Sequence, residues 1–258
     1  MIPAARRRQI GDVLRRIERR ERVRILLAVE SGSRAWGFAS PDSDYDVRFV
    51  YARPLDWYLA LQQPRDVIEL PIDDLLDVNG WDIQKALRLA CKPNPVLLEW
   101  LQSPIVYRRQ AGFAPRLLRL FARADHRAAC RFHYARLGRR QFATYIDGRD
   151  SVALKKYFYS LRPALALAWL RANPGLVPMD MARLRAGVDL PGAAAAEIDR
   201  LLAAKQRTRE LGEGPRFRAL DDFMLGEFAL AEASTERPRV DAETVAAATA
   251  LFRALVRA

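Results

Sequence analysis

One stretch decides the fold of this chain: LLAVESGSRAWGFASPDSDYDVRFVY, residues 26–51. Its first residues complete an apolar run over 23–30, which has the length of a buried strand. Small residues follow and predict a turn. Residues 45–51 then alternate, with Tyr45, Val47 and Phe49 on one side, so they predict a second strand with one buried face.

Two carboxylates stand where this second strand begins. Asp44 and Asp46 are separated by one residue, so strand periodicity places both on one face. Paired carboxylates repel each other unless a cation lies between them, and hard oxygen ligands suit Mg²⁺. Gly32 and Ser33, in the preceding turn, can approach a phosphate closely through their backbone. The stretch therefore predicts a site for a metal and a nucleotide.

The rest of the chain divides into a mixed part and a helical part. Residues 66–71 and 75–80 predict two more strands, and residues 4–21 and 81–91 predict helices. Beyond residue 105 no further strand pattern is clear, and helices are expected over 112–145, 151–172, 193–211, 219–233 and 241–257. We therefore expect a catalytic α/β domain over 1–106 and an α-helical domain over 107–258.

Composition narrows the class of protein. The chain has 258 residues and a formal net charge of +12, which favours polyanionic partners such as nucleic acid or nucleotides. No apolar run reaches the ~20 residues that span a bilayer, and the basic N-terminus lacks the apolar stretch of a signal peptide. Cys91 and Cys130 form no ligand or disulfide pattern. We expect a cytoplasmic protein without a membrane partner.

Two long blocks of sequence resemble a known family. They are ESGSRAWGFASPDSDYDVRFVY (30–51) and GWDIQKALRLACKPNPVLLEWLQSPIVY (80–107), and YFYSLRPALALAWL (157–170) adds a weaker match. The Gly-Ser turn followed by Asp-x-Asp on a strand is similar to the DNA polymerase beta superfamily of nucleotidyltransferases. The longer blocks resemble a bacterial group of predicted nucleotidyltransferases that includes RNA-repair-associated members.

This resemblance implies a fold and an activity. The fold is α+β, with an N-terminal polymerase-beta-like domain, a mixed sheet flanked by helices, followed by an α-helical domain. The activity is metal-dependent transfer of a nucleoside monophosphate from an NTP, such as ATP, to an acceptor. Two Mg²⁺ or Mn²⁺ ions would be held by Asp44, Asp46 and a third carboxylate from a later strand.

Two residues are candidates for the third carboxylate. If residues 75–80 form a strand with Val78 in the core, Asp77 faces the same side as Asp44 and Asp46. Asp82 lies at or just inside the following helix, where an acidic residue is also favoured. Both remain candidates for the catalytic site, and Asp77 is the candidate for the metal.

Three cations are candidates for contacts with the triphosphate. Arg34 either contacts the phosphates or caps the turn, and Arg48, on the same strand face as Asp46, either binds phosphate or neutralises the carboxylates. Lys85 either binds phosphate or lies on a solvated helix face. Together with Gly32 and Ser33 they form the predicted nucleotide-binding set.

A run of arginines follows the predicted catalytic domain. These arginines recur at steps of three or four residues, so they would form a basic stripe along one helix: Arg116, Arg119, Arg123, Arg127 and Arg131. Such a stripe favours RNA as the acceptor, and its alternative is a solvated face. Two other functions remain open: transfer of AMP to a hydroxyl of a protein or small molecule, and a catalytically weak nucleic-acid-binding module.

Overall fold

The computed structural model describes residues 2–62, 65–73, 75–207 and 212–257. The chain forms two compact units, each assembled from separate segments. Unit 1 comprises Met1–Gly32, Asp44–Asp125 and Arg239–Ala258. Unit 2 comprises Ser33–Ser43 and His126–Pro238.

Unit 1 is built on a mixed sheet. In the described residues, five strands lie in the order β3-β4-β2-β1-β5, where β4 and β2 are parallel and the other neighbours antiparallel. Their bounds are Arg24–Glu30 (β1), Tyr45–Ala52 (β2), Val67–Glu69 (β3), Leu76–Asp82 (β4) and Val106–Arg109 (β5). The mixed sheet with its helices confirms the predicted α+β class.

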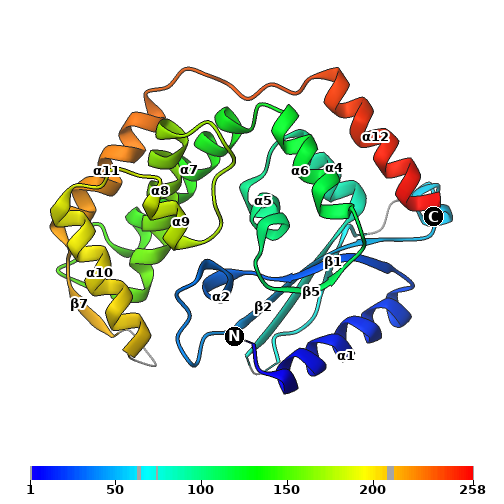
Figure 1. The fold of residues 1–258 in the computed structure, drawn as a ribbon, viewed down its shortest axis with the longest axis horizontal. Helices are drawn as coiled ribbons and strands as arrows, with labels where there is room; N and C mark the ends of the chain where they lie inside the picture. The colour runs from blue at the N-terminus through cyan, green and yellow to red at the C-terminus, as the bar shows by residue number, and fades with distance from the viewer. Residues whose placement is uncertain (1, 63–64, 74, 208–211, 258) are drawn as a thin grey trace. The chain divides into compact units, whose positions relative to one another are not determined.

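Helices cover both faces of this sheet (Figure 1). Helix α1 (Ala4–Glu21) packs Ile10, Val13 and Leu14 against one face, where Val47 and Phe49 of β2 are fully buried. The other face is covered by α4 (Ile83–Cys91), α5 (Pro95–Gln102) and α6 (Phe113–Arg123). The alternation read over residues 45–51 therefore describes the strand correctly.

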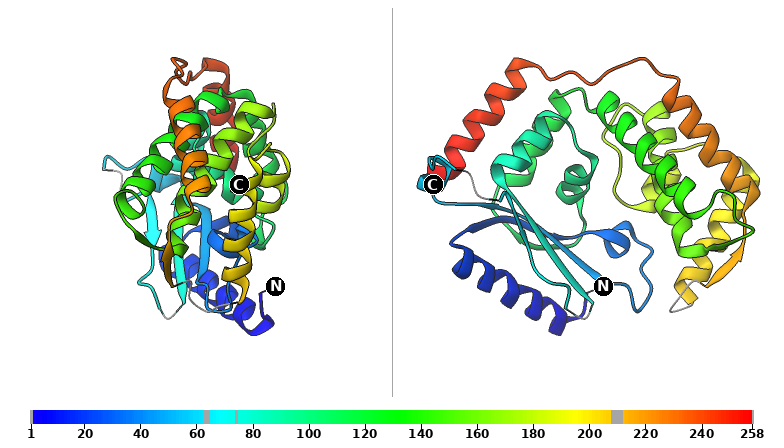
Figure 2. Two further views of the ribbon diagram at one scale, coloured as in Figure 1. Left: turned by 90° about the vertical axis from the view of Figure 1, so that its left-hand side faces the viewer. Right: turned by 180° about the vertical axis from the view of Figure 1, so that it is seen from behind.

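The C-terminal helix returns to unit 1. Helix α12 (Ala242–Arg257) packs against α4 and α6, as the view from behind shows (Figure 2). The short helix α3 (Leu55–Tyr58) follows β2 in the chain. The compact units thus do not follow the expected division at residue 106, because α6 and α12 bury their apolar faces against unit 1.

Unit 2 is mainly helical. Its longest helix, α7 (His126–Tyr145), packs against α8 (Tyr157–Ala172) and α11 (Arg218–Glu232), and α8 is buried along nearly its whole length. The remaining elements are α9 (Met181–Ala186), α10 (Gly192–Arg207) and a short pair, β6 (Ser151–Ala153) with β7 (Glu213–Pro215). Most of α2 (Gly32–Trp36) also belongs here.

The structure corrects several predicted elements. The sequence pattern does not predict strand β5, because four residues at the edge of a sheet show too little alternation to be recognised. The helix expected over 112–145 is two helices, because Ala124 has extended backbone and Asp125 follows it. The helix expected over 151–172 begins only at Tyr157, after β6 and a 3₁₀ turn over Leu154–Lys156. Residues 208–211 of the predicted helix 193–211 lie outside the described residues.

None of the described helices is long and apolar enough to cross a membrane.

Candidate functional site

Asp46 and Asp77 lie side by side on neighbouring strands. In the parallel pairing of β2 with β4, Asp46 stands opposite Asp77 and Val47 opposite Val78. Both valines are buried in a core cluster together with Phe49 and residues of α1. Because side chains alternate along a strand, the two aspartates point to the other face of the sheet. Their side chains are 26% and 33% exposed, which leaves both accessible to a ligand.

Arg48 joins these two carboxylates. Its Nη2 donates to Asp46 Oδ1 at 3.1 Å and to Asp77 Oδ2 at 2.6 Å, while Nη1 donates to the carbonyl of Asp77 at 3.1 Å. The Arg48 side chain is only 18% exposed. A guanidinium thus supplies the positive charge that two facing carboxylates require, which is one of the two roles the sequence left open for Arg48.

Asp44 precedes β2 and is exposed. Tyr45, between the two aspartates, is buried, so alternation along the chain assigns Asp44 to the same face as Asp46. Within the described residues, no group of three or more Asp, Glu, His or Cys side chains is already assembled as a metal site. The pair Asp46 and Asp77 is therefore the part of the predicted metal site that the fold brings together.

Gly32 lies directly against Asp46. Its backbone has φ +60°, in the left-handed region, and a Cβ added to it would overlap with Oδ2 of Asp46. The neighbouring Ser31 N–H donates to the carbonyl of Asp46 at 2.8 Å. The two halves of the sequence motif are thus in contact, and only glycine leaves room for the Asp46 carboxylate.

Glu30 is a functional candidate that the sequence analysis missed. It is fully buried at the end of β1, and its Oε1 accepts a hydrogen bond from the backbone N–H of Asp46 at 2.8 Å. Its Oε2 accepts from the hydroxyl of Tyr107 on β5, and its carbonyl accepts from Ser103 Oγ at 2.6 Å. A charged residue closing an apolar strand was the available signal, since a buried acid requires partners.

Asp82 has a structural place away from the carboxylate pair. It caps α4 by accepting from the backbone N–H of Gln84 at 2.7 Å, and it accepts from the hydroxyl of Tyr58 at 2.8 Å. Because a strand rises about 3.3 Å per residue, Asp82 lies roughly 16 Å farther along β4 than Asp77. It also alternates with Asp77 on the opposite face, so the fold does not bring it to Asp46.

Burial governs the ionisation of this cap. Desolvation raises the pKa of the Asp82 carboxyl above its ordinary value, although the bonds from Gln84 and Tyr58 act in the other direction. Burial likewise raises the pKa of the Tyr58 hydroxyl, so the tyrosine stays protonated and donates. The pair forms a buried hydrogen-bonded group at the start of α4.

The remaining predicted nucleotide-binding residues are Lys85, Arg34 and Ser33. Lys85 Nζ donates to Asp66 at 3.1 Å and lies over the ring of Trp81, near the Asp82 end of β4. Arg34 donates to the carbonyl of Ser43 within unit 2, which is the turn-capping role left open for it. Ser33 stands in the first turn of α2, and its carbonyl accepts from the N–H of Phe38 at 3.1 Å.

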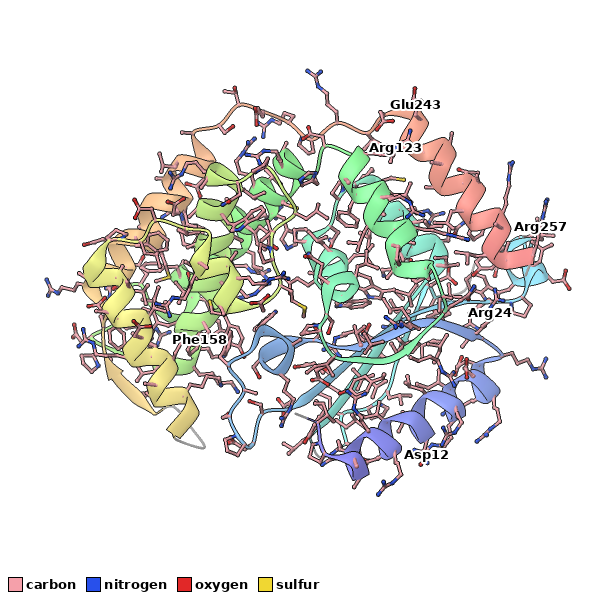
Figure 3. The ribbon with its side chains drawn as sticks, viewed as in Figure 1. Asp12, Arg24, Arg123, Phe158, Glu243 and Arg257 are labelled. Atoms are coloured by element: carbon pink, nitrogen blue, oxygen red, sulfur yellow. The ribbon has the colours of Figure 1, made fainter. Side chains whose placement is uncertain are left out.

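The predicted arginine stripe is wrong as a single helical face. Arg116, Arg119 and Arg123 belong to α6 in unit 1, whereas Arg127 and Arg131 belong to α7 in unit 2. Arg123 pairs with Glu243 of α12 at 3.2 Å (Figure 3). Arg127 donates to the carbonyls of Leu170 and Asn173, and Arg131 pairs with Glu236. The helix break at 124–125 separates the two groups.

Carboxylates on neighbouring strands behind a glycine turn define a class of protein, the polymerase-beta-like nucleotidyltransferases. Sequence comparison agrees with this class. The chain belongs to the RNA repair pathway DNA polymerase beta family (RlaP), whose profile matches residues 7–254. The resemblance seen in the motif blocks is therefore confirmed at the level of the family.

Two individual proteins are similar to this chain. An uncharacterized protein from Bacillus subtilis (strain 168), YcgL, is 45% identical over 218 residues, which cover 84% of each chain. A crystal structure of a nucleotidyltransferase-like protein from Exiguobacterium sibiricum is 15% identical, with a TM-score of 0.31 over 87% of this chain and 75% of that one.

The first prediction tests the structural role of Asp82 as the cap of α4. Asp82→Ala removes the acceptor for Gln84 and Tyr58 and should destabilise the protein by about 2 kcal/mol, the sum of a cap and a buried hydrogen bond. Asp82→Asn keeps an acceptor and should fold normally. Thermal unfolding of both variants measures the difference.

The pH dependence of Asp82→Asn follows from the raised pKa. A carboxyl whose pKa is higher in the folded state stabilises the protein fully below its unfolded value, about 4, and loses that contribution as pH rises through the folded value. The melting temperature of Asp82→Asn relative to the wild type should therefore increase as the pH rises above about 4. A constant difference would contradict the buried, titrating cap.

The second prediction concerns the contact between Gly32 and Asp46. Gly32→Ala should displace the Asp46 carboxylate and lower any nucleotidyl transfer at least about tenfold, as expected when a catalytic group moves by 1 Å. Gly37→Ala is the matched control, since Gly37 also has a positive φ but has no atom within 4 Å of an added Cβ. Both should cost about 1–2 kcal/mol of stability from backbone strain. Equal activity in the two folded variants would rule out the contact as functional.

Proposed function

We propose that this protein transfers a nucleoside monophosphate from an NTP to an RNA hydroxyl, using Mg²⁺ or Mn²⁺ bound by Asp46 and Asp77. Asp44, which directly precedes the strand that carries Asp46, completes the set. The observation that supports this proposal most strongly is the pairing of Asp46 opposite Asp77 on an accessible sheet face. Membership of a polymerase-beta family supports the reaction type.

The residues present fit a divalent cation. Two carboxylates on adjacent parallel strands offer hard oxygen ligands on one face, and the cation that now balances them is the guanidinium of Arg48. The overlap that a Cβ at position 32 would make with Asp46 also indicates a cradle kept free of side chains. When bound, the metal would polarise the phosphates and stabilise the charge that develops during the displacement.

The chain's own residues would orient and deprotonate the reactants. Glu30 fixes the backbone of Asp46 through its N–H and thereby sets the direction of the carboxylate. The acceptor hydroxyl would attack the α-phosphorus of the NTP, its proton passing to the Asp77 carboxylate, and the bond to pyrophosphate would break. Arg48, already beside both carboxylates, would neutralise negative charge as phosphates enter.

The description of the matched family supports RNA as the proposed acceptor. The description of the family as part of an RNA repair pathway suggests a polynucleotide acceptor rather than a protein or small molecule. The net charge of +12 is consistent with a polyanionic substrate. Comparing the transfer rates with ATP, GTP, CTP and UTP in one assay measures which base the enzyme prefers.

The third prediction tests the carboxylate pair. With α-³²P-labelled NTPs, Mg²⁺ and a single-stranded RNA, the wild type should label the RNA, and Asp46→Asn or Asp77→Asn should lower the rate at least about a hundredfold. Asp12→Asn removes an exposed carboxylate from α1 of the same unit and should leave the rate unchanged. Near-wild-type labelling by Asp46→Asn or Asp77→Asn would refute the assignment. Label appearing on protein or in a small molecule would replace RNA as the acceptor.

The fourth prediction tests metal dependence without catalysis. ATP with Mg²⁺ should raise the melting temperature, because it binds the folded state. At an ATP concentration about a hundredfold above Kd, the free energy of unfolding should increase by about 2.7 kcal/mol. EDTA should remove most of this shift, since the carboxylates otherwise repel the triphosphate. Asp77→Asn should lose the Mg²⁺-dependent part only. An equal shift with and without the metal would exclude the proposed site.

A further inference from the structure

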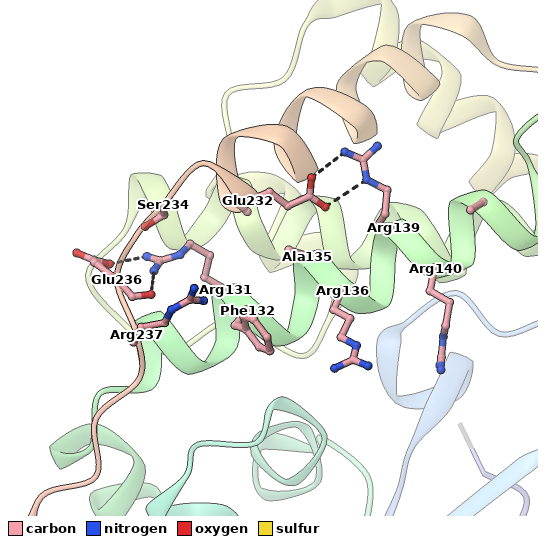
Figure 4. A pocket seen from close by; sticks show the side chains of 12 residues that line it. Arg131, Phe132, Ala135, Arg136, Arg139, Arg140, Glu232, Ser234, Glu236 and Arg237 are labelled. Atoms are coloured by element: carbon pink, nitrogen blue, oxygen red, sulfur yellow. Dashed lines mark hydrogen bonds and ion pairs between the residues drawn. The ribbon is translucent and has the colours of Figure 1, made fainter.

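Unit 2 contains a groove lined largely by arginines (Figure 4). Its volume is about 550 Å³, and it lies between α7 and the segment that follows α11. Its lining includes Phe132, Arg136 and Arg140 of α7, together with Arg237. None of these residues belongs to the carboxylate site in unit 1.

Two of the groove's arginines have carboxylate partners. Arg139 forms two hydrogen bonds with Glu232 at 3.2 and 3.0 Å, and Arg131 pairs with Glu236 and donates to its carbonyl. Both pairs tie α7 to the end of α11 and the following segment. These ion pairs account for the two acids in the groove, so Arg131 and Arg139 serve to hold its walls together.

The other three arginines are not neutralised. Among the residues that the structure describes, the side chains of Arg136, Arg140 and Arg237 form no ion pair or hydrogen bond. Arg136 and Arg140 are four residues apart, so they project from the same side of α7, about 6 Å apart along the helix axis. Figure 4 shows both pointing away from Glu232. The groove therefore carries uncompensated positive charge.

An exposed aromatic ring continues the same row. Phe132 lies four residues before Arg136 and is 52% exposed, although the other phenylalanines of this unit that face α7 are buried. Figure 4 shows its ring on the side of α7 that bears Arg136 and Arg140. An exposed ring beside unpaired guanidinium groups offers a flat apolar face on which a nucleic-acid base can stack.

We propose that this groove binds the acceptor as single-stranded RNA, with one base stacked on Phe132 and consecutive phosphates on Arg136, Arg140 and Arg237. Platforms for single-stranded nucleic acid combine these two elements, an aromatic ring for a base and a row of cations for the backbone. The inference rests on the proposed function, because it supplies the surface that holds the RNA whose hydroxyl reacts.

The chemistry of the groove favours RNA over other anionic macromolecules. An anionic lipid surface would satisfy the arginines but offers no π face to the phenyl ring, and an acidic peptide offers one only where an aromatic side chain interrupts its acids, whereas every nucleotide of RNA carries both a phosphate and a base. The groove also has no described lysine among its lining residues, and arginine pairs with phosphate oxygens through two donors at once. The proposed ligand uses both features of the groove.

The test measures binding of a 5′-fluorescein-labelled 15-nucleotide single-stranded RNA by anisotropy over a range of KCl concentrations. Phe132→Leu should weaken binding at least about fivefold, whereas Phe132→Tyr, which retains a ring, should bind like the wild type. Arg136→Gln with Arg140→Gln should also weaken binding. This double variant should reduce the slope of log K against log [KCl] by about 1.4, because each phosphate contact on a single strand contributes about 0.7.

A matched control removes equal charge elsewhere in unit 2. Arg183→Gln with Arg200→Gln also deletes two exposed arginines, neither of which lines the groove, and should leave both affinity and salt slope nearly unchanged. If both double variants change the slope equally, RNA binding is a diffuse charge effect and the groove is not the site. Circular dichroism and thermal unfolding verify that each variant is folded.

Two other anionic probes test the alternatives to RNA: polyglutamate with the same charge as the 15-nucleotide RNA, and vesicles of phosphatidylserine with phosphatidylcholine. Binding of each is measured to the wild type and to the groove variants. Binding of either that falls with Phe132→Leu as much as RNA binding does would overturn the assignment to RNA. The Mg²⁺-dependent thermal shift with ATP should be the same in the groove variants as in the wild type. RNA binding that needs the groove without any nucleotidyl transfer would refute the proposed function alone. Transfer to RNA that ignores the groove would refute this inference alone.

Discussion

Parallel pairing of β2 with β4 is the constraint on which the site depends. It places Asp46 opposite Asp77, and the buried Val47 and Val78 fix which face the two carboxylates share. A shift of one residue in this register would turn one carboxylate into the core that α1 covers. The apolar packing of α1 therefore determines on which face of the sheet the charged groups lie.

Placing two acids together has an electrostatic cost that the surrounding residues offset. Arg48 lies between Asp46 and Asp77 and donates to both, so the apposed pair is compatible with a stable sheet. Glu30 adds a third acid nearby, fully buried but bonded to the Asp46 N–H and to Tyr107. The missed strand β5 matters for this reason, since it carries Tyr107 and completes the surroundings of Glu30.

The positive charge of the chain is less available than its composition suggests. Arg123, Arg131 and Arg139 are engaged with glutamates, and Arg127 with backbone carbonyls. Many of the arginines thus stabilise contacts between helices. The described cations without such partners in the groove of unit 2, Arg136, Arg140 and Arg237, are not those singled out by counting steps along the sequence.

The sequence by itself determined the strands around the motif, the shared face of Asp44 and Asp46, and the family, because alternation and a short motif are local properties of the chain. Only the tertiary structure decided between Asp77 and Asp82 as neighbours of Asp46, since strand register joins residues that are far apart in sequence. It also decided that α6 and α12 pack in unit 1, that Glu30 supports Asp46, and that the arginine run is split between two helices. Each of these depends on long-range packing and hydrogen bonding, which residue spacing along one segment does not encode.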